Sequence, residues 1–106
     1  MQDNKYKIGQ KIKEIRKKSG FTQENFSEKI GIEPSSLSNI ENGKSYPSMQ
    51  TVLNILNTFD VKPENFFDFD YFTTDLDLEN KIIEIVKRQP LDKKQIMYKI
   101  IKQFDI

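Results

Sequence analysis

The sequence predicts an all-α fold, and three observations support this. Apolar residues recur three and four positions apart through most of the chain, as on one face of a helix. Glycine, proline and capping residues separate these segments at helical lengths. No stretch keeps the alternating pattern of a strand. The chain has 106 residues, which fits one small domain, or a small domain with an appendage.

The first predicted helix covers about residues 5–18. Ile8, Ile12 and Ile15 recur at spacings of four and three, so they share one face. A Ser-Gly pair follows, and Gly20 is expected to end the helix because glycine adopts a left-handed C′ conformation without a Cβ clash.

Two short helices follow, joined by a turn of three or four residues. Thr22 is predicted to cap the first of them and Gly31 to end it. Pro34 suits the first turn of the next helix, and Asn42-Gly43 ends that helix. These lengths are typical of a helix-turn-helix, in which one helix enters the DNA major groove while the other crosses the backbone. Helical bundles that bind no DNA also contain such turns.

Further helical segments are predicted downstream. Ser48 can cap a fourth helix, and Pro63 opens one more turn. Residues 66–72 hold five aromatic side chains, some of which must be covered. A helix over 76–88 and a last helix capped by Asp92 then form an αα-hairpin.

Charge is distributed unevenly along the chain. The net charge is +1, yet residues 1–18 hold seven cations against two acids, and residues 60–84 hold eight acids against two lysines. Basic segments often meet nucleic acid. The alternative is an ordinary solvated helix face.

The composition argues against catalysis. The chain has no cysteine and no histidine, which removes the thiol nucleophile, the usual general base and the commonest metal ligands. Five acids between Asp68 and Glu79 could suggest a metal loop. An EF-hand needs glycine at its sixth position, however, and the sixth residue from Asp68 is Thr73. We therefore expect no enzyme, no cofactor and no metal site.

No targeting segment or membrane span is expected. The N-terminus lacks the apolar region of a secretory signal. No stretch approaches the ~20 apolar residues that a spanning helix needs. We expect a cytoplasmic protein with no membrane partner.

A more specific pattern lies in residues 21–44. It reads Thr-Gln-Glu, then Gly, then Ser-Asn-Ile-Glu-Asn-Gly-Lys, and the segments on either side match as well. The pattern resembles the phage-repressor/Cro/Xre helix-turn-helix family over roughly residues 6–68. The resemblance implies a five-helix, lambda-repressor-like DNA-binding bundle over residues 1–68, followed by a C-terminal helical hairpin over residues 69–106.

The resemblance also implies roles for single residues. On a helix that begins near Pro34, positions 35, 36 and 39 lie opposite Leu37 and Ile40, so spacing alone predicts that they are exposed. Gln23 is expected to meet a phosphate and to brace the front of the third helix. Arg16 and Glu41 match a structural ion pair. The implied base-facing residues are Pro34, Ser35, Ser36 and Asn39, and the phosphate-facing residues are Gln23, Asn42, Lys44 and, as a weaker candidate, Lys11.

The chemistry of this face favours A·T-containing half-sites. Asn39 can make a two-point contact with adenine, and serine pairs with either kind of base. The face carries no Arg or Lys for guanine. Two positions depart from the family pattern: Ser27 stands where a small Ala is usual, and Glu33 stands at the N-cap of the third helix, where Ser or Thr is common. Glutamate caps poorly, and its charge repels phosphate.

The hairpin has three possible uses. DNA readers of this class usually bind as two-fold dimers, and a second hairpin would offer each apolar stripe a symmetric partner. Alternatively, the hairpin extends the core or docks another protein, such as an anti-repressor or a toxin. We therefore expect a homodimeric repressor of double-stranded DNA with a pseudo-palindromic operator; the alternative is an antitoxin-like interaction module. The residues predicted to dimerise are Ile82, Ile85, Val86, Ile96, Met97, Ile100, Ile101 and Phe104.

Overall fold

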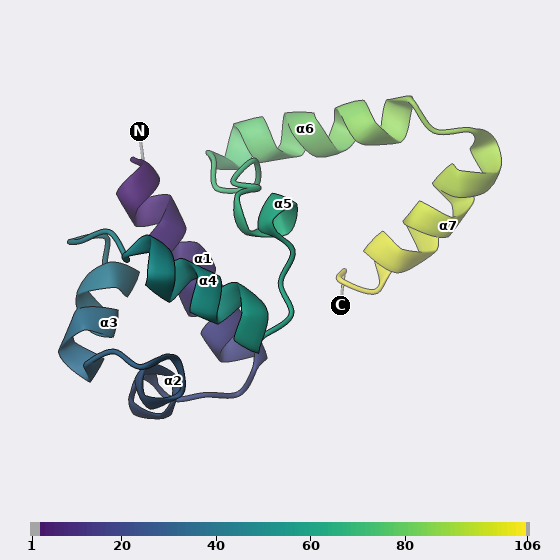
Figure 1. Ribbon diagram of the computed structural model, residues 1–106. Coiled ribbons are helices and arrows are strands. Elements are labelled where there is room, and N and C mark those ends of the chain that lie inside the picture. Colours follow the sequence, from purple (N-terminus) through teal and green to yellow (C-terminus); the bar gives the residue numbers. More distant parts are fainter. Residues whose placement is uncertain (1–2, 106) are drawn as a thin grey trace. The chain divides into compact units, whose positions relative to one another are not determined.

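The computed structural model describes residues 3–105, and over that range the chain forms helices and no strand (Figure 1). The all-α class predicted from the sequence is confirmed. The helices are α1 (Asn4–Lys18), α2 (Gln23–Ile30), α3 (Pro34–Glu41), α4 (Met49–Thr58), α5 (Pro63–Phe66), α6 (Asp75–Lys87) and α7 (Leu91–Lys102).

The capping residues read from the sequence set the starts of α2 and α4. The Thr22 hydroxyl accepts a hydrogen bond from the backbone N–H of Asn25, and the Ser48 hydroxyl accepts one from that of Thr51. Each bond satisfies a donor that the helix itself leaves free. At the other end of α2, Gly31 has a φ of 81°, a backbone conformation that a Cβ disfavours.

The start of α7 differs from the sequence prediction. The N-cap is Pro90, at φ −70° and ψ 165°, and it makes no side-chain capping bond. Asp92 was predicted to be the cap, but it lies inside the first turn. Proline has its φ already fixed near this value and ends the preceding segment, so the helix begins directly after it. Asp92 still faces the positive end of the helix dipole.

The chain divides into two compact units, one ending at Phe72 and the other beginning at Thr73. We call them unit 1 and unit 2. The sequence prediction placed the boundary four residues earlier, after residue 68. The difference arises because Tyr71 is tied to α1: its hydroxyl accepts from Lys11 Nζ at 2.6 Å and donates to Glu14 Oε2 at 2.7 Å.

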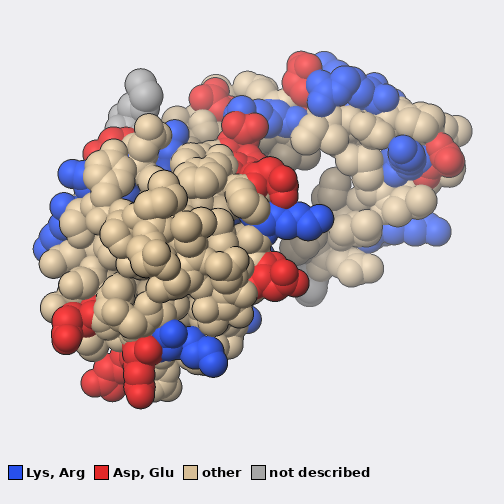
Figure 2. Space-filling view, in the orientation of Figure 1, with Lys and Arg blue, Asp and Glu red and all other residues tan. Residues whose placement is uncertain are grey.

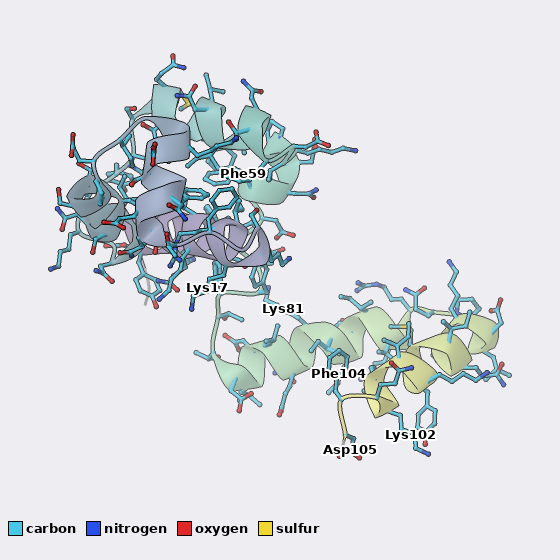
Figure 3. The ribbon with its side chains drawn as sticks, turned by 90° about the horizontal axis from the view of Figure 1, so that it is seen from below. Lys17, Phe59, Lys81, Lys102, Phe104 and Asp105 are labelled. Carbon is cyan, nitrogen blue, oxygen red and sulfur yellow. The ribbon has the colours of Figure 1, made fainter. Side chains whose placement is uncertain are left out.

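Unit 1 has a continuous apolar core. Ile12 from α1, Leu37 from α3 and Ile55 from α4 are fully buried within it. The ring of Phe59, which points into the bundle in Figure 3, stacks on Phe26 with ring centroids 4.9 Å apart. In the aromatic run, Phe66 is fully buried whereas Phe67 is half exposed. Part of that run is covered, as predicted.

Unit 2 has no comparable core. Neither α6 nor α7 contains a buried residue. Of the eight apolar residues predicted to dimerise, Val86 and Met97 are partly buried and the other six are exposed. Phe104, just after α7 in Figure 3, is 83% exposed. None of the described helices is both long and apolar enough to span a lipid bilayer.

Candidate nucleic-acid interface

The orientation of α3 is set by a glycine turn at its start. The N–H groups of Gly31 and Ile32 both donate to the carbonyl of Ser27 and close the end of α2. Ser27 itself is fully buried, so its small side chain permits the close approach that alanine would give. The turn holds α2 and α3 in the arrangement of a helix-turn-helix (Figure 1).

The far end of α3 is held by a buried polar cluster around Glu41. Arg16 Nε donates to Glu41 Oε2 at 2.8 Å, which confirms the predicted ion pair. Gln10 donates to the Glu41 carbonyl at 3.1 Å. These contacts, together with the packing of α1 against α3, fix both the axial position and the tilt of α3.

Gln23 belongs to this cluster, and one prediction about it is wrong. Its Nε2 donates to Glu41 Oε1 at 3.1 Å, so it braces the last residue of α3 and not its front. The start of α2 lies beside the end of α3 because Arg16 of α1 donates both to the Phe21 carbonyl, just before α2, and to Glu41. One amide N–H of Gln23 remains for a phosphate, which stays a prediction.

The predicted reading face lies on the surface. Pro34, Ser35, Ser36 and Asn39 are all exposed, whereas Leu37 and Ile40 are buried in the core. The exposure derived from helical spacing is therefore confirmed. Their contact with bases stays a prediction.

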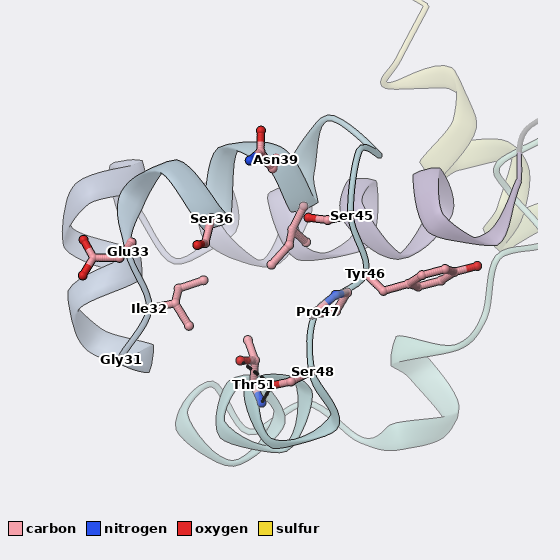
Figure 4. Close-up of a pocket in the computed structure, with 11 residues that line it drawn as sticks. Gly31, Ile32, Glu33, Ser36, Asn39, Ser45, Tyr46, Pro47, Ser48 and Thr51 are labelled. Atoms are coloured by element: carbon pink, nitrogen blue, oxygen red, sulfur yellow. Dashed lines mark hydrogen bonds between the residues drawn. The ribbon is translucent and has the colours of Figure 1, made fainter.

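A groove of about 530 Å³ runs beside this face, between α3 and the start of α4 (Figure 4). Glu33, Ser36 and Asn39 line it from the α3 side. The segment 45–48 and Thr51 line it from the other. Among the described residues of the lining, Glu33 alone is charged, so the polar groups of the groove are hydroxyls, an amide and a single carboxylate.

Lysine and arginine side chains surround the groove between α3 and α4 and do not line it. In Figure 2 the face over α4, whose ten residues carry no charge, is almost free of blue and red, and charged side chains gather at its edge. Asn42 and Lys44, predicted to face phosphates, are exposed in the loop after α3. Lys5 was not among the predicted phosphate contacts, and only the basic N-terminal segment pointed to it. Its Nζ lies 5.4 Å from the ring centroid of exposed Tyr46.

The structure places Lys11 differently from the prediction. It was predicted to face a phosphate, but its side chain is 11% exposed and its ammonium is engaged by Tyr71 and Glu14. The chain bends back onto α1 after α5, which covers this lysine. Burial and the hydrogen bond to Glu14 raise the pKa of the Tyr71 phenol well above its ordinary value. The cluster therefore keeps Tyr71 neutral and serves structure.

Comparison with known proteins decides the family. A family model described as a helix-turn-helix domain matches residues 9–69, the same part of the chain that holds α2, α3 and the buried cluster. The chain belongs to this helix-turn-helix family. Within the described residues, no group of three or more acidic side chains is placed to hold a metal ion.

Two regulators and one solved structure resemble this helix-turn-helix chain. The HTH-type transcriptional regulator ImmR of Bacillus subtilis is 29% identical over 100 residues, which cover 92% of this chain and 79% of that protein. SinR of the same organism, also named an HTH-type transcriptional regulator, is 33% identical over 93 residues, covering 83% and 84%. The crystal structure of the restriction-modification controller protein C.AhdI from Aeromonas hydrophila matches 58% of this chain and 94% of its own, with a TM-score of 0.54 and 27% identity.

Proposed function

We propose that the chain is a repressor that binds a pseudo-palindromic DNA operator as a homodimer, with α6 and α7 forming the dimer interface. The coarser statement, that it is a DNA-binding transcription regulator, follows from its family and from the regulators that it resembles. The proposal includes a cytoplasmic location and a binding function without catalysis. The observation that carries it is the exposed polar face of α3, held rigidly by the cluster around Glu41.

The length of the helices in unit 2 supports dimerisation. α6 has 13 residues and α7 has 12, and isolated helices shorter than about 12–15 residues are marginal in water. Because neither buries a residue, both need a partner surface to be stable. A second copy would supply one to each.

The charges of the two helices suit such a pairing. α6 holds four acids and two lysines, which is −2, whereas α7 holds one acid and four lysines, which is +3. An arrangement in which α6 of one copy meets α7 of the other is self-complementary, as a two-fold interface requires. The similarity to ImmR covers 92% of the chain and so reaches into unit 2.

A single charge in the apolar stripe tests this interface. Ile100 lies in the stripe, and Gln95 lies on the opposite side of α7. We expect the full chain to be a dimer by light scattering, Ile100→Asp to be a monomer with weakened operator binding, and Gln95→Asp to match the wild type. Equal behaviour of the two variants would contradict a dimer through α7.

The second candidate function is an antitoxin-like or anti-repressor-binding module. The exposed apolar residues of α6 and α7 favour it, because exposed apolar stripes mark protein-binding surfaces in general. A wild-type chain that stays monomeric at concentrations well above those needed to bind DNA would favour this alternative over the homodimer.

A further inference from the structure

Glu33 occupies the N-cap position of α3 without capping it. Its side chain makes no hydrogen bond to the first turn, is exposed, and forms no ion pair with the residues that the structure describes. Serine or threonine at this position would satisfy a free backbone N–H. The carboxylate therefore satisfies none of the free backbone donors at the start of the helix.

The position of Glu33 places it with the reading face. It lines the same groove as Ser36 and Asn39, and Figure 4 shows it at one end of that groove. Spacings of three residues set the three side chains along one side of α3. On this part of the surface a carboxylate is repelled by DNA phosphates, unless it meets a hydrogen-bond donor on a base.

We propose that Glu33 selects cytosine within each half-site. This rests on the proposed function, since it assumes that α3 lies in the major groove. In that groove the cytosine N4 amine is a donor that a carboxylate can accept from. Guanine O6 and N7 and thymine O4 are acceptors that would repel a carboxylate, and adenine places its N7 acceptor beside its N6 donor. Each half-site then combines an adenine read by Asn39 with a cytosine read by Glu33.

The rejection of guanine and thymine by Glu33 contributes as much to specificity as its attraction to cytosine. With guanine or thymine at this position, the carboxylate would be desolvated without a donor, which is costly for a charge. We therefore expect each of these bases to lower affinity by about tenfold, the usual scale for one mismatched pair. A neutral side chain at position 33 would lift most of that penalty.

Site selection from a random-sequence duplex library with the full chain tests the proposal. The variants are Glu33→Gln and, as a control, Glu28→Gln, which removes the same charge from an exposed site on α2 outside the groove. We expect the wild type and Glu28→Gln to select cytosine at one fixed position of each half-site. Glu33→Gln should shift that position to adenine, which glutamine contacts at two points, and leave the other positions unchanged. Because Glu33 makes no capping bond, the melting temperature of Glu33→Gln should stay close to that of the wild type.

Two results would overturn the proposal. One leaves the proposed function standing, and the other overturns that function as well. If Glu33→Gln and Glu28→Gln both tighten binding to all sequences and neither alters any position, Glu33 acts only as a general repulsive charge, and the proposed function stands. If the wild type enriches no sequence, the proposed function fails together with the role of Glu33.

Discussion

Arg16 and Glu41 form a two-point ion pair that joins α1 to the last residue of α3. Nε and Nη2 of the guanidinium donate to the two carboxylate oxygens at 2.8 and 3.0 Å. The side chains are 11% and 2% exposed, and Gln23 donates to the same carboxylate. Because the pair is buried and shared, it holds α3 in one orientation before DNA arrives.

Loss of Glu41 should be strongly destabilising. Glu41→Ala leaves the Arg16 guanidinium buried without its partner, which costs about 3–5 kcal/mol of unfolding free energy. Urea denaturation measures this cost. Lys18→Ala breaks the exposed Lys18–Glu14 pair and should cost about 0–1 kcal/mol. Similar losses for the two variants would show that burial of the pair is unimportant.

Gly9 should not tolerate alanine, although it lies inside a helix. Glycine to alanine in an exposed helix interior stabilises by up to about 1 kcal/mol. A Cβ on Gly9, however, would overlap the backbone carbonyl oxygen of Ile40, so α1 and α3 would have to separate. We expect Gly9→Ala to destabilise by about 1–3 kcal/mol, as measured by thermal unfolding. A stabilised variant would mean that the helices do not approach this closely.

Tyr71→Phe should destabilise unit 1 in a pH-dependent way. At pH 7 the Lys11 ammonium loses a hydrogen-bond acceptor, at a cost of about 1–3 kcal/mol. Since burial raises the pKa of this phenol, the folded state holds its proton more tightly than the unfolded state. The stability from Tyr71 is therefore complete below pH ~10 and declines as the pH rises further.

Urea unfolding at pH 7 and pH 11 checks this dependence. The difference between the wild type and Tyr71→Phe should be smaller at pH 11. Tyr98→Phe alters an exposed phenol in unit 2 and should change the free energy by less than ~0.5 kcal/mol at pH 7. A difference for Tyr71→Phe that grows with pH would contradict the raised pKa.

Asn39→Ala and Lys44→Ala should weaken DNA binding in different ways. Loss of Asn39 should cost about 1–3 kcal/mol on the operator and relax one base position, whereas loss of Lys44 should weaken all sequences alike and lower the salt slope by about 1. Fluorescence anisotropy on operator and random duplexes at several salt concentrations separates the two effects. Equal losses on both duplexes for Asn39→Ala would remove it from the reading face.

Local signals predicted most of the fold, and long-range contacts account for the errors. Thr22, Ser48 and Gly31 act through backbone groups a few residues away, so their roles can be read from sequence. The ties from Tyr71 to Lys11 and from Gln23 to Glu41 span 60 and 18 residues. No helical periodicity reports such contacts, so the unit boundary and the burial of Lys11 required the structure.

The candidate interface also combines features that the sequence predicts with features that only the structure shows. Helical spacing alone predicted that Ser36 and Asn39 are exposed, because Leu37 and Ile40 must face the core. The ion pair of Arg16 with Glu41 came from the family resemblance. The poor capping by Glu33 was predicted from the residue type, and the structure shows no capping bond from its side chain. The groove beside α3 depends on the path of segment 45–48, which no sequence pattern specifies.

Selection of binding sites from random duplex DNA by the full wild-type chain, at about physiological salt, tests the homodimeric DNA reader most directly. We predict a pseudo-palindrome whose half-site centres lie about one helical turn, or a multiple of it, apart, with ~34 Å per turn. Enrichment of a single unpaired half-site would contradict the homodimer. The absence of any enriched sequence would contradict sequence-specific recognition by α3.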